Sequence, residues 1–358
     1  IKNMKKFIKN LLAQFNYFFK NQKIPDVLNN LNIETTSKCN LSCKFCAYNK
    51  RDLDVVPYET MSNNFFIKVV NQAIEMGYKN IGLTPTTGDI FMDKEILNKI
   101  KYLEERKSLN GYYFYTNFIP LNNDKIISLF RLNKLKNFGI SIYGHDKESF
   151  QKFSGGSEAS YFKLIKNLNF FYNCLINNNN LNLKIEISQR AKKDFKLSNS
   201  NSELSEILKK ILMIKNVEYS QNSDFNNWGG IIKNEDVNEL DIKLNDTHKK
   251  KIGSCSLIYS RLIVGANGLV NACACRDANF SLAIGNVKTE NLKNIISLKN
   301  KKYKDLIYKQ EKNDFPDVCK SCDFYKSIYQ DNDFIWSFRD EKVKHFSLKD
   351  TLKTLDKR

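Results

Sequence analysis

Strand-like and helix-like segments alternate along residues 32–222, and this alternation constrains the fold more than any other feature of the sequence. Short apolar runs indicate strands, and apolar residues that recur every three or four positions indicate helices. The expected strands lie at 32–37, 80–86, 111–117, 137–144, 183–189 and 216–221, and the expected helices at 61–77, 93–110, 124–135, 161–176 and 202–212. This pattern predicts a parallel sheet with helices outside it and with functional residues at the carboxyl ends of the strands.

Polar residues mark the starts of several expected helices. Ser62, Asp93 and Asp124 stand where a short polar side chain caps the first free backbone amides. We therefore expect helices to begin at these residues, and Gly77 to end the first of them. The sheet and its helices are expected to occupy residues 31–235.

The character of the sequence changes beyond residue 235. Residues 255–285 are expected to form a hairpin with its turn at 266–268, followed by a helix at 291–308. A CKSC knuckle comes next, so residues 236–330 are expected to form a small, cysteine-rich, metal-dependent appendage. Residues 331–358 are expected to form a charged, helical tail.

Residues 1–30 form a basic, amphipathic segment. Lys9 and Lys20 interrupt its apolar residues and no cleavage site of small residues follows, so a signal peptide is not expected. An amphipathic helix fits better, either docked on the rest of the chain or resting weakly on a membrane surface. No run approaches the roughly 18 apolar residues of a membrane-spanning helix, so no transmembrane segment is expected.

The amino-acid composition bears on the cellular compartment and on whether nucleic acid is a partner. The chain has nine cysteines and no export signal, which favours a reducing, cytoplasmic compartment where thiols bind metals or react. The formal charge of +18 would suit nucleic acid, but the basic residues are scattered along the whole chain. Nucleic acid is therefore not an expected partner.

Cys39, Cys43 and Cys46 lie in a C-x3-C-x2-C pattern directly after the first expected strand. A structural zinc site needs four closed ligands, and no fourth cysteine or histidine lies nearby in sequence. Thiolates also hold cubane iron–sulfur clusters, and three of them leave one iron of a [4Fe–4S] cube open for another ligand. A zinc knuckle and unrelated thiols are the alternatives.

The run CNLSCKFC at 39–46 resembles the signature of the radical S-adenosylmethionine (radical SAM) superfamily, including the aromatic residue before the last cysteine. The resemblance implies an α/β fold, a partial (β/α)6 TIM-like barrel, which agrees with the six expected strands. It also implies that Cys39, Cys43 and Cys46 hold a [4Fe–4S] cluster whose open iron binds SAM. An electron from this cluster would cleave SAM to methionine and a 5′-deoxyadenosyl radical.

The same resemblance implies SAM-binding residues near the ends of the strands. Thr87, Gly88 and Asp89, followed by Ile90, resemble the family's G-G-E-P loop. Thr87 stands in place of the first glycine, Asp89 in place of the glutamate and Ile90 in place of the proline. The other residues with an implied SAM contact are Phe45, Thr116, Asn117, Ser141, Gln189 and Arg190. Arg190 is also the one candidate for a catalytic role. Thr116 and Ser141 have an alternative interpretation, in which they are ordinary packing residues of their strands with satisfied hydrogen bonds.

A second group of cysteines lies in the expected appendage. Cys255, Cys273, Cys319 and Cys322 supply four thiolates, which by spacing alone suit either zinc or an iron–sulfur cluster. The C-x12-G-x4-C spacing resembles the start of the SPASM/twitch appendages of radical SAM enzymes, and no cysteine follows the knuckle. The resemblance therefore implies the twitch form with one auxiliary [4Fe–4S] cluster. Cys275 is an alternative to Cys273 as the hairpin ligand.

Two further features carry no assigned role. Cys174 lies beside Phe170 and Phe171 on an apolar helix face, so it is expected in the core. The stretch DFNNWGG at 224–230 also resembles this group of enzymes, although a tight turn with a packed tryptophan explains it as well.

The implied activity is hydrogen abstraction from an unactivated carbon of a bound substrate. The resemblance to twitch enzymes implies a two-electron oxidation of a sugar-like small molecule, with the auxiliary cluster as electron acceptor. Maturation of a peptide or protein is the alternative. Flavodoxin or ferredoxin would supply the electron that starts the reaction. A non-catalytic, zinc-binding protein that interacts with RNA is a hypothesis of another class.

Overall fold

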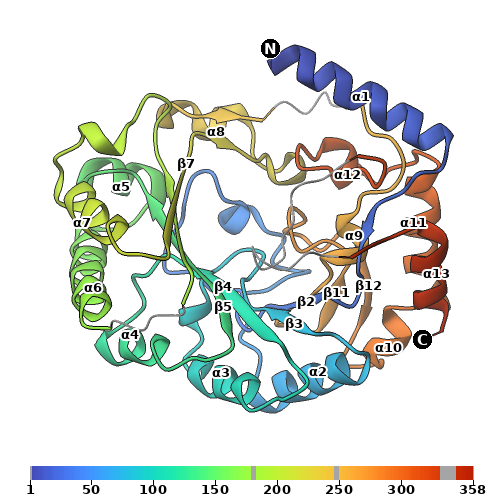
Figure 1. The fold of residues 1–358 in the computed structure, drawn as a ribbon, viewed down its shortest axis with the longest axis horizontal. Helices are drawn as coiled ribbons and strands as arrows, with labels where there is room; N and C mark the ends of the chain where they lie inside the picture. The colour runs from blue at the N-terminus through green and yellow to red at the C-terminus, as the bar shows by residue number, and fades with distance from the viewer. Residues whose placement is uncertain (1, 179–182, 246–249, 331–343, 358) are drawn as a thin grey trace.

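A nine-stranded sheet forms the centre of the computed structural model, which describes residues 2–178, 183–245, 250–330 and 344–357. The strand order is β12-β11-β10-β2-β3-β4-β5-β6-β7. Neighbouring strands from β10 to β7 are parallel, whereas β11 is antiparallel to both β10 and β12. Figure 1 shows helices around the outside of this sheet. The fold is therefore a partial parallel barrel, as the alternation predicts.

The strands β2 to β7 correspond in place and order to the six strands expected from the sequence. The strands of the sheet are β2 (Asn30–Ile33), β3 (Asn80–Gly82), β4 (Gly111–Thr116), β5 (Leu135–Tyr143), β6 (Ile185–Arg190), β7 (Val217–Asn222), β10 (Ile263–Val264), β11 (Leu269–Asn271) and β12 (Ala283–Asn286). Two small pairings join β1 (Ile24–Pro25) to β13 (His345–Phe346) and β8 (Asp224–Phe225) to β9 (Lys243–Leu244).

The helices α2 to α7 connect the parallel strands from β2 to β7, and the other helices lie before or after this part of the chain. The helices have the following bounds. They are α1 (Lys2–Phe18), α2 (Asn63–Glu75), α3 (Ile96–Glu104), α4 (Asn123–Leu129), α5 (Lys147–Ser154), α6 (Glu158–Ile176), α7 (Glu203–Leu212), α8 (Asn234–Val237), α9 (Leu257–Ser260), α10 (Leu292–Ile295), α11 (Lys301–Glu311), α12 (Asp317–Ser321) and α13 (Leu348–Asp356). The sequence did not predict α5, which Asp146 caps through the amide of Ser149.

Of the predicted helix caps, one is confirmed and two are wrong. Ser62 accepts a hydrogen bond from a backbone amide at 3.3 Å and caps α2. Asp93 lies three residues before α3 and forms a buried ion pair with Lys99 at 2.5 Å. Asn122 caps α4 in place of Asp124, which lies inside the first turn, where the helix has already begun.

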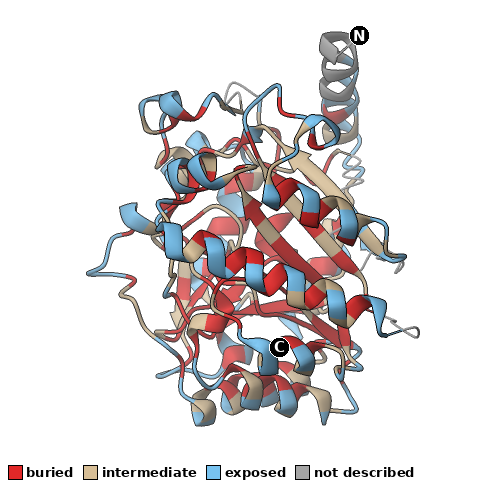
Figure 2. Ribbon diagram, turned by 90° about the vertical axis from the view of Figure 1, so that its left-hand side faces the viewer, coloured by how far each residue is buried: buried red, intermediate tan, exposed pale blue. Residues whose placement is uncertain are grey.

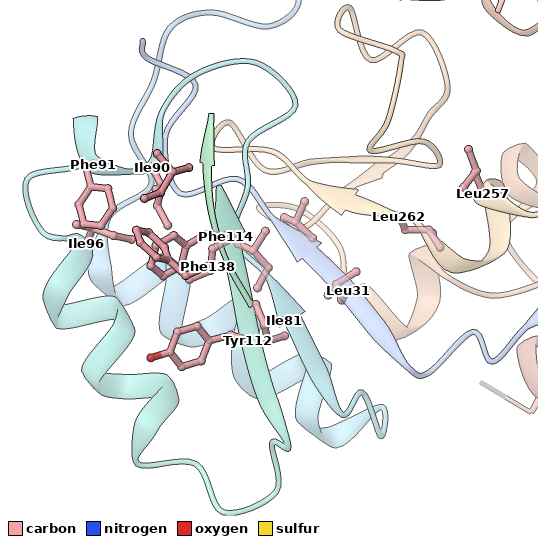
Figure 3. Close-up of a cluster of buried hydrophobic side chains, with 14 of the residues drawn as sticks. Leu31, Ile81, Ile90, Phe91, Ile96, Tyr112, Phe114, Phe138, Leu257 and Leu262 are labelled. Atoms are coloured by element: carbon pink, nitrogen blue, oxygen red, sulfur yellow. The ribbon is translucent and has the colours of Figure 1, made fainter. Parts of the chain in front are cut away.

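The hydrophobic core lies between the sheet and the outer helices (Figure 3). The Phe138 ring on β5 lies 5.6 Å from the Phe114 ring on β4 and 6.0 Å from the Phe171 ring on α6. Cys174 on α6 is partly buried against this core, as expected. Figure 2 shows buried residues along the strands and exposed residues on the outer sides of the helices. Because side chains alternate along a strand, the residues between the core positions face the inside of the barrel.

The appendage differs from its prediction in three ways. It is joined to the barrel, because Ile263 on β10 pairs with Asn32 on β2 in parallel register. The segment Leu257–Ser260 is a short helix, not part of a hairpin strand. The expected helix at 291–308 is divided into α10 and α11, since Asn300 caps the second helix through a side-chain hydrogen bond. The β10–β11 turn itself lies where it was predicted.

The short strand that follows α1 pairs with the short strand that precedes α13, and Ile24 of β1 lies opposite Phe346 of β13. Of the predicted helical tail, residues 331–343 lie outside the described part, and α13 is helical. None of the described helices combines the length and the apolar character needed to cross a membrane.

Candidate functional site: two cysteine centres joined by a common loop

The first group of cysteines lies on the loop between β2 and the short 3-10 helix η1 (Ala47–Lys50). Cys43 is buried, and Cys39 and Cys46 are partly buried. Burial, and then the nearby Asp89 carboxylate, raises the pKa of Cys39 to about 12. A thiol of this kind gives up its proton when iron binds it, so the burial of the group is compatible with an iron–sulfur cluster.

Buried polar atoms without a hydrogen-bond partner surround this loop in the described structure. They are Asn40 Nδ2, Arg51 Nε and Thr86 Oγ1. Such atoms cost free energy unless a ligand or a water pairs with them. Two of them are donors and the third is a hydroxyl, so a ligand with a carboxylate and an amino group would satisfy them. The three thiols and these atoms therefore fit a cluster with SAM beside it.

The segment at 87–89 lies directly against the cysteine loop. The Asp89 amide donates to the Lys38 carbonyl at 2.9 Å. Gly88 has φ +126°, and a Cβ atom there would lie 2.9 Å from the same carbonyl, so the close approach requires glycine. The Arg51 guanidinium donates to Thr87 Oγ1 at 2.8 Å, which gives the threonine a structural role.

The Asp89 carboxylate fixes the end of β4 to this segment. It accepts hydrogen bonds from the amides of Asn117 (2.7 Å) and Phe91 (2.9 Å) and from the hydroxyl of Thr116 (2.8 Å). Burial raises the pKa of Asp89, and these hydrogen bonds oppose that rise. The Thr116 hydroxyl also lies 3.0 Å from the other carboxylate oxygen, so these contacts occupy both oxygens of Asp89 and fix the surrounding backbone in place. Asn117 in turn donates to Asn40 on the cysteine loop at 2.8 Å.

Glu34 and Arg51 are two buried charged residues that the sequence reasoning missed. Glu34 accepts a hydrogen bond from the Thr86 amide at 3.0 Å and another from the amide of Ala266 in the β10–β11 turn. Burial raises the pKa of Glu34 to about 7, although the Arg51 charge opposes the rise. The available signal was an acidic residue inside an expected strand, where a charge needs a specific partner.

Alternation along β6 places Arg190 and Gln189 on opposite faces of the sheet. Arg190 faces inward, with its guanidinium 5.6 Å from the ring centroids of both Phe45 and Phe225. Gln189 is fully buried on the outer face, where its side chain donates to a loop carbonyl at 2.8 Å. Ser141 is partly exposed on the inner face of β5. The structure thus gathers Phe45, Ser141 and Arg190 on the cysteine side of the sheet, and leaves Gln189 outside.

The cysteines of the second group interact with one another in the appendage. The Cys273 thiol lies close enough to Cys255, Cys319 and Cys322 to contribute electrostatically to the raised pKa of each. Cys275 instead has Cys273, Cys255 and two arginines around it. Burial is the main cause that raises the pKa of Cys255 to about 12 and that of Cys322 to about 11. The Cys273 and Cys275 side chains also share a hydrogen bond, so these two thiols lie side by side in the group.

Hydrogen-bond donors point at three of these sulfur atoms. The pairs are Gln310 Nε2 with Cys319 Sγ at 3.3 Å, the Phe324 amide with Cys322 Sγ at 3.3 Å, and the Lys326 amide with Cys255 Sγ at 3.5 Å. Gln310 is fully buried and also accepts from the Cys255 amide at 2.9 Å. Hydrogen bonds to sulfur help to set the reduction potential of an iron–sulfur cluster, so these donors fit such a cluster.

The DFNNWGG stretch joins the two cysteine groups. Trp228 Nε1 donates to the Phe45 carbonyl in the first loop at 3.0 Å. The Asn227 backbone amide donates to the Asp323 carboxylate at 3.0 Å, and its side chain donates to the Ser321 carbonyl at 2.7 Å. These two contacts lie at the CKSC knuckle of the second group. Neither the turn interpretation nor the resemblance predicted this connection.

Arg276 lies between the same two groups of cysteines. Its guanidinium is 5.3 Å from the Trp228 ring centroid and 4.3 Å from that of Phe324. Burial raises the pKa of Cys46 and of Cys322, and the positive charge of Arg276 opposes the rise at both. One arginine therefore acts electrostatically on a thiol of each group.

Within the described residues, no three His, Cys, Asp or Glu side chains are placed to share a single metal ion. A [4Fe–4S] cube makes a different demand on its ligands, because each thiolate binds a different iron atom.

Known solved structures share this fold. BtrN in complex with AdoMet and 2-DOIA is 15% identical, with 84% of this chain and 94% of BtrN covered and a TM-score of 0.52. Native anSMEcpe with bound AdoMet is 14% identical, with 91% of this chain and 95% of anSMEcpe covered and a TM-score of 0.52. At these identities the likeness shows the fold alone. A comparison with curated proteins finds no match.

Family models match both parts of the chain that carry cysteine groups. Residues 33–178 match the radical SAM superfamily, and residues 255–323 match the SPASM iron–sulfur cluster-binding domain. The first match contains the three-cysteine loop and the second contains the four-cysteine group, so the hypothesis of a non-catalytic zinc-binding protein is wrong. The chain is a radical SAM enzyme, a member of that superfamily with a C-terminal SPASM iron–sulfur domain.

Proposed function

We propose that this radical SAM enzyme oxidises a hydroxyl-bearing, sugar-like small molecule by two electrons. The observation that carries the proposal is the polar inner face of the sheet. A packed barrel fills its inside with bulky apolar residues. Here the inner face carries partly exposed polar side chains, and all but Ser141 form side-chain hydrogen bonds. They are Tyr113, Tyr115, Asn137, Ser141, Glu186, Ser188 and Asn222.

Glycines in the strands make room for this polar face. A Cβ atom at Gly139 would lie 2.0 Å from the Tyr115 ring, and one at Gly82 would lie 2.5 Å from the Tyr113 hydroxyl. Glycine weakens the interior of a strand, so its presence at both places needs such a reason. Across Gly139, the Tyr115 hydroxyl donates to Glu186 at 2.6 Å. The sheet thereby offers hydroxyl and carboxylate groups that match the hydroxyls of a sugar-like molecule.

The SPASM domain reaches the same inner face. Arg261 donates to the Tyr113 hydroxyl at 2.6 Å, and its charge also acts on Cys275. The polar face therefore lies next to the second cysteine group. This proximity supports an oxidation, because an electron acceptor held by the second cysteine group would lie near the reacting carbon of the substrate.

The proposed oxidation removes one hydrogen atom from a carbon, one proton from its hydroxyl and one electron. When bound, the two clusters and SAM supply the radical chemistry and the electron acceptor. Flavodoxin or ferredoxin supplies the starting electron. Glu186, in contact with Tyr115, is placed on the inner face to take the hydroxyl proton.

We assign SAM binding to the residues that the structure gathers around the first cysteine loop. They are Phe45, Thr87, Gly88, Asp89, Thr116, Asn117, Ser141 and Arg190. Gln189 is left out of this set, because its side chain faces outward and is already hydrogen-bonded. The cluster ligands in the proposal are Cys39, Cys43 and Cys46 for the first cluster, and Cys255, Cys273, Cys319 and Cys322 for a single auxiliary cluster.

The solved structures of similar fold support the proposal in part. BtrN binds a small molecule, 2-DOIA, together with AdoMet. The anSMEcpe structure matches this chain equally well by TM-score, so the fold by itself does not choose a substrate class.

The test is deuterium transfer from an extract of cells grown on deuterated medium. The extract is divided by size into small polar metabolites and larger peptides and proteins, and each fraction is incubated with the reduced enzyme and unlabelled SAM. We expect deuterium in 5′-deoxyadenosine only with the small-molecule fraction. Deuterium transfer only from the peptide fraction would replace the proposal with peptide maturation. The Cys39→Ala/Cys43→Ala/Cys46→Ala variant is the control that should transfer none.

A further inference from the structure

The N-terminal helix α1, together with the residue that follows it, exposes six large apolar side chains to solvent. These side chains are Ile8, Leu11, Leu12, Phe15, Phe18 and Phe19, with exposed fractions between 48% and 79%. Their spacing of three and four residues places them along one side of a helix. We call them the apolar face of α1. Figure 1 shows α1 at the edge of the molecule.

The opposite side of α1 fixes the helix to the protein. Ala13 is 1% exposed, the Asn16 side chain donates to the Tyr329 carbonyl at 3.0 Å, and the Tyr17 hydroxyl donates to the Glu311 carbonyl at 3.2 Å. The Tyr17 and Tyr329 rings also meet edge to face at 4.9 Å. The helix is therefore docked on the rest of the chain, which is one of the two arrangements expected from the sequence. It docks through Ala13, Asn16 and Tyr17, and not through its leucine and phenylalanine side chains. Rotation of the apolar face onto the protein would break these contacts.

Charge indicates what covers the apolar face. Residues 1–23 contain six lysines, at positions 2, 5, 6, 9, 20 and 23, and no acidic residue. The whole chain has a formal charge of +18. A helix with phenylalanine and leucine on one side and lysine in the rest of its sequence has the composition of helices that lie in the interface of a bilayer. Anionic lipid head groups would attract this charge.

We propose that α1 binds the surface of an anionic lipid bilayer, with its apolar face in the interface. The 17 residues of α1 make a rod of about 25 Å, at about 1.5 Å per residue, which is suited to lie flat on a bilayer. A second copy of the chain fits the face less well, because pairing two such helices would bring two lysine-rich segments together. Binding at α1 would hold the barrel at the membrane surface without a spanning segment.

The experiment is co-sedimentation of the full-length protein with lipid vesicles under anaerobic conditions. One set of vesicles contains phosphatidylcholine with phosphatidylglycerol, and the other contains phosphatidylcholine alone. We expect the protein to sediment with the anionic vesicles, and to do so less as salt is raised. The Phe15→Ser/Phe18→Ser variant should bind at least about tenfold more weakly, because two large side chains no longer enter the interface. Both substitutions are at exposed positions, so the fold and SAM cleavage should be unchanged.

A matched control removes two exposed apolar side chains elsewhere. Phe162 is 50% exposed and Met213 is 83% exposed, and the Phe162→Ser/Met213→Ser variant should bind like the wild type. Equal loss in both variants, or no sedimentation of the wild type with anionic vesicles, would overturn the proposal. A dimer seen by analytical ultracentrifugation without lipid, and lost in Phe15→Ser/Phe18→Ser, would assign the apolar face to a second copy instead.

Discussion

Glu34 shows how one buried carboxylate can hold several parts of the site together. It accepts amide hydrogen bonds from Thr86, next to the segment at 87–89, and from the β10–β11 turn, and it lies directly after β2, where the chain leads into the cysteine loop. Its pKa is about 7, against a usual value of 4.5. Between these values the folded protein binds more protons than the unfolded chain, so the stability contribution of Glu34 falls as pH rises.

The first prediction follows from that sign. Wild-type protein should lose about 3 kcal/mol of stability from this group as pH rises from about 5 to about 8. Glu34→Gln removes the ionisation and should show a smaller loss over the same range. The measurement is the thermal unfolding midpoint of the anaerobic protein at both pH values. The exposed Glu75→Gln variant is the control, and equal pH dependence in the wild type and Glu34→Gln would contradict the account.

A second prediction concerns Asp89, whose carboxylate orders the end of β4 beside the cysteine loop. Asp89→Ala should weaken SAM binding roughly tenfold to a hundredfold, since charged hydrogen bonds are each worth about 1.5–3 kcal/mol. The first cluster should still assemble, because all three cysteines remain. Calorimetric titration with SAM gives the dissociation constant, with the exposed Asp124→Ala variant as control. A change below twofold would remove Asp89 from the site.

At this scale the sequence pointed to the cysteines of the site more readily than to the residues that support them. Cys39, Cys43 and Cys46 could be singled out as candidate ligands because their spacing along one loop is itself the chemical signal. Arg51 and Trp228 were missed, because their partners Thr87 and Phe45 are far away in the sequence. Such contacts depend on how the loops come together, which local spacing does not encode.

At the scale of elements, the loop at 224–230 couples the two cysteine-bearing segments. Trp228→Phe keeps a large ring beside Arg276 but removes the hydrogen bond to the Phe45 carbonyl. The bond is worth about 1 kcal/mol, so the SAM dissociation constant should rise about fivefold while the iron content stays the same. Trp228→Ala, which also removes the ring, should have the larger effect. Unchanged SAM binding in both variants would show that the loop does not position the first cluster.

The hairpin after β10 provides the next prediction. Cys273 neighbours all three other cysteines of its group, whereas Cys275 lies toward the arginines. Cys273→Ala should therefore lose the auxiliary cluster, and Cys275→Ala should keep its iron and most of its activity. Iron analysis and electron paramagnetic resonance of both variants distinguish them. The reverse result would show that Cys275 is the ligand.

Helices and strands were predicted well where the hydrophobic periodicity was strong. They were predicted less well in the appendage, where buried polar contacts set the shape of the chain. The helix α6 has a long apolar stripe and appears where expected. The appendage has short strands of two to four residues, and its shape depends on buried polar contacts such as those of Gln310. Short apolar runs such as Leu257–Ser260 do not distinguish a strand from a helix by period alone.

At the scale of the whole molecule, alternation predicted the parallel sheet, because short connections and parallel pairing leave few other arrangements. The resemblance to the radical SAM superfamily implied that this sheet forms a partial barrel. The sequence did not show that the appendage hairpin continues the barrel sheet through β10 and β2. That pairing places the second cysteine group beside the inner face of the barrel, through Arg261 and Tyr113. The outward apolar face of α1 was also not predicted, since the amphipathic pattern does not tell which side is docked.

The central claim is that the chain holds two four-iron clusters, one with three cysteine ligands and an open iron and one with four cysteine ligands. Iron, sulfide and SAM cleavage should be measured together in the anaerobic wild type and in Cys39→Ala/Cys43→Ala/Cys46→Ala. We expect about eight iron atoms in the wild type and about four in the variant, which should cleave no SAM. An unchanged iron content in the variant, or SAM cleavage that survives the three substitutions, would contradict it.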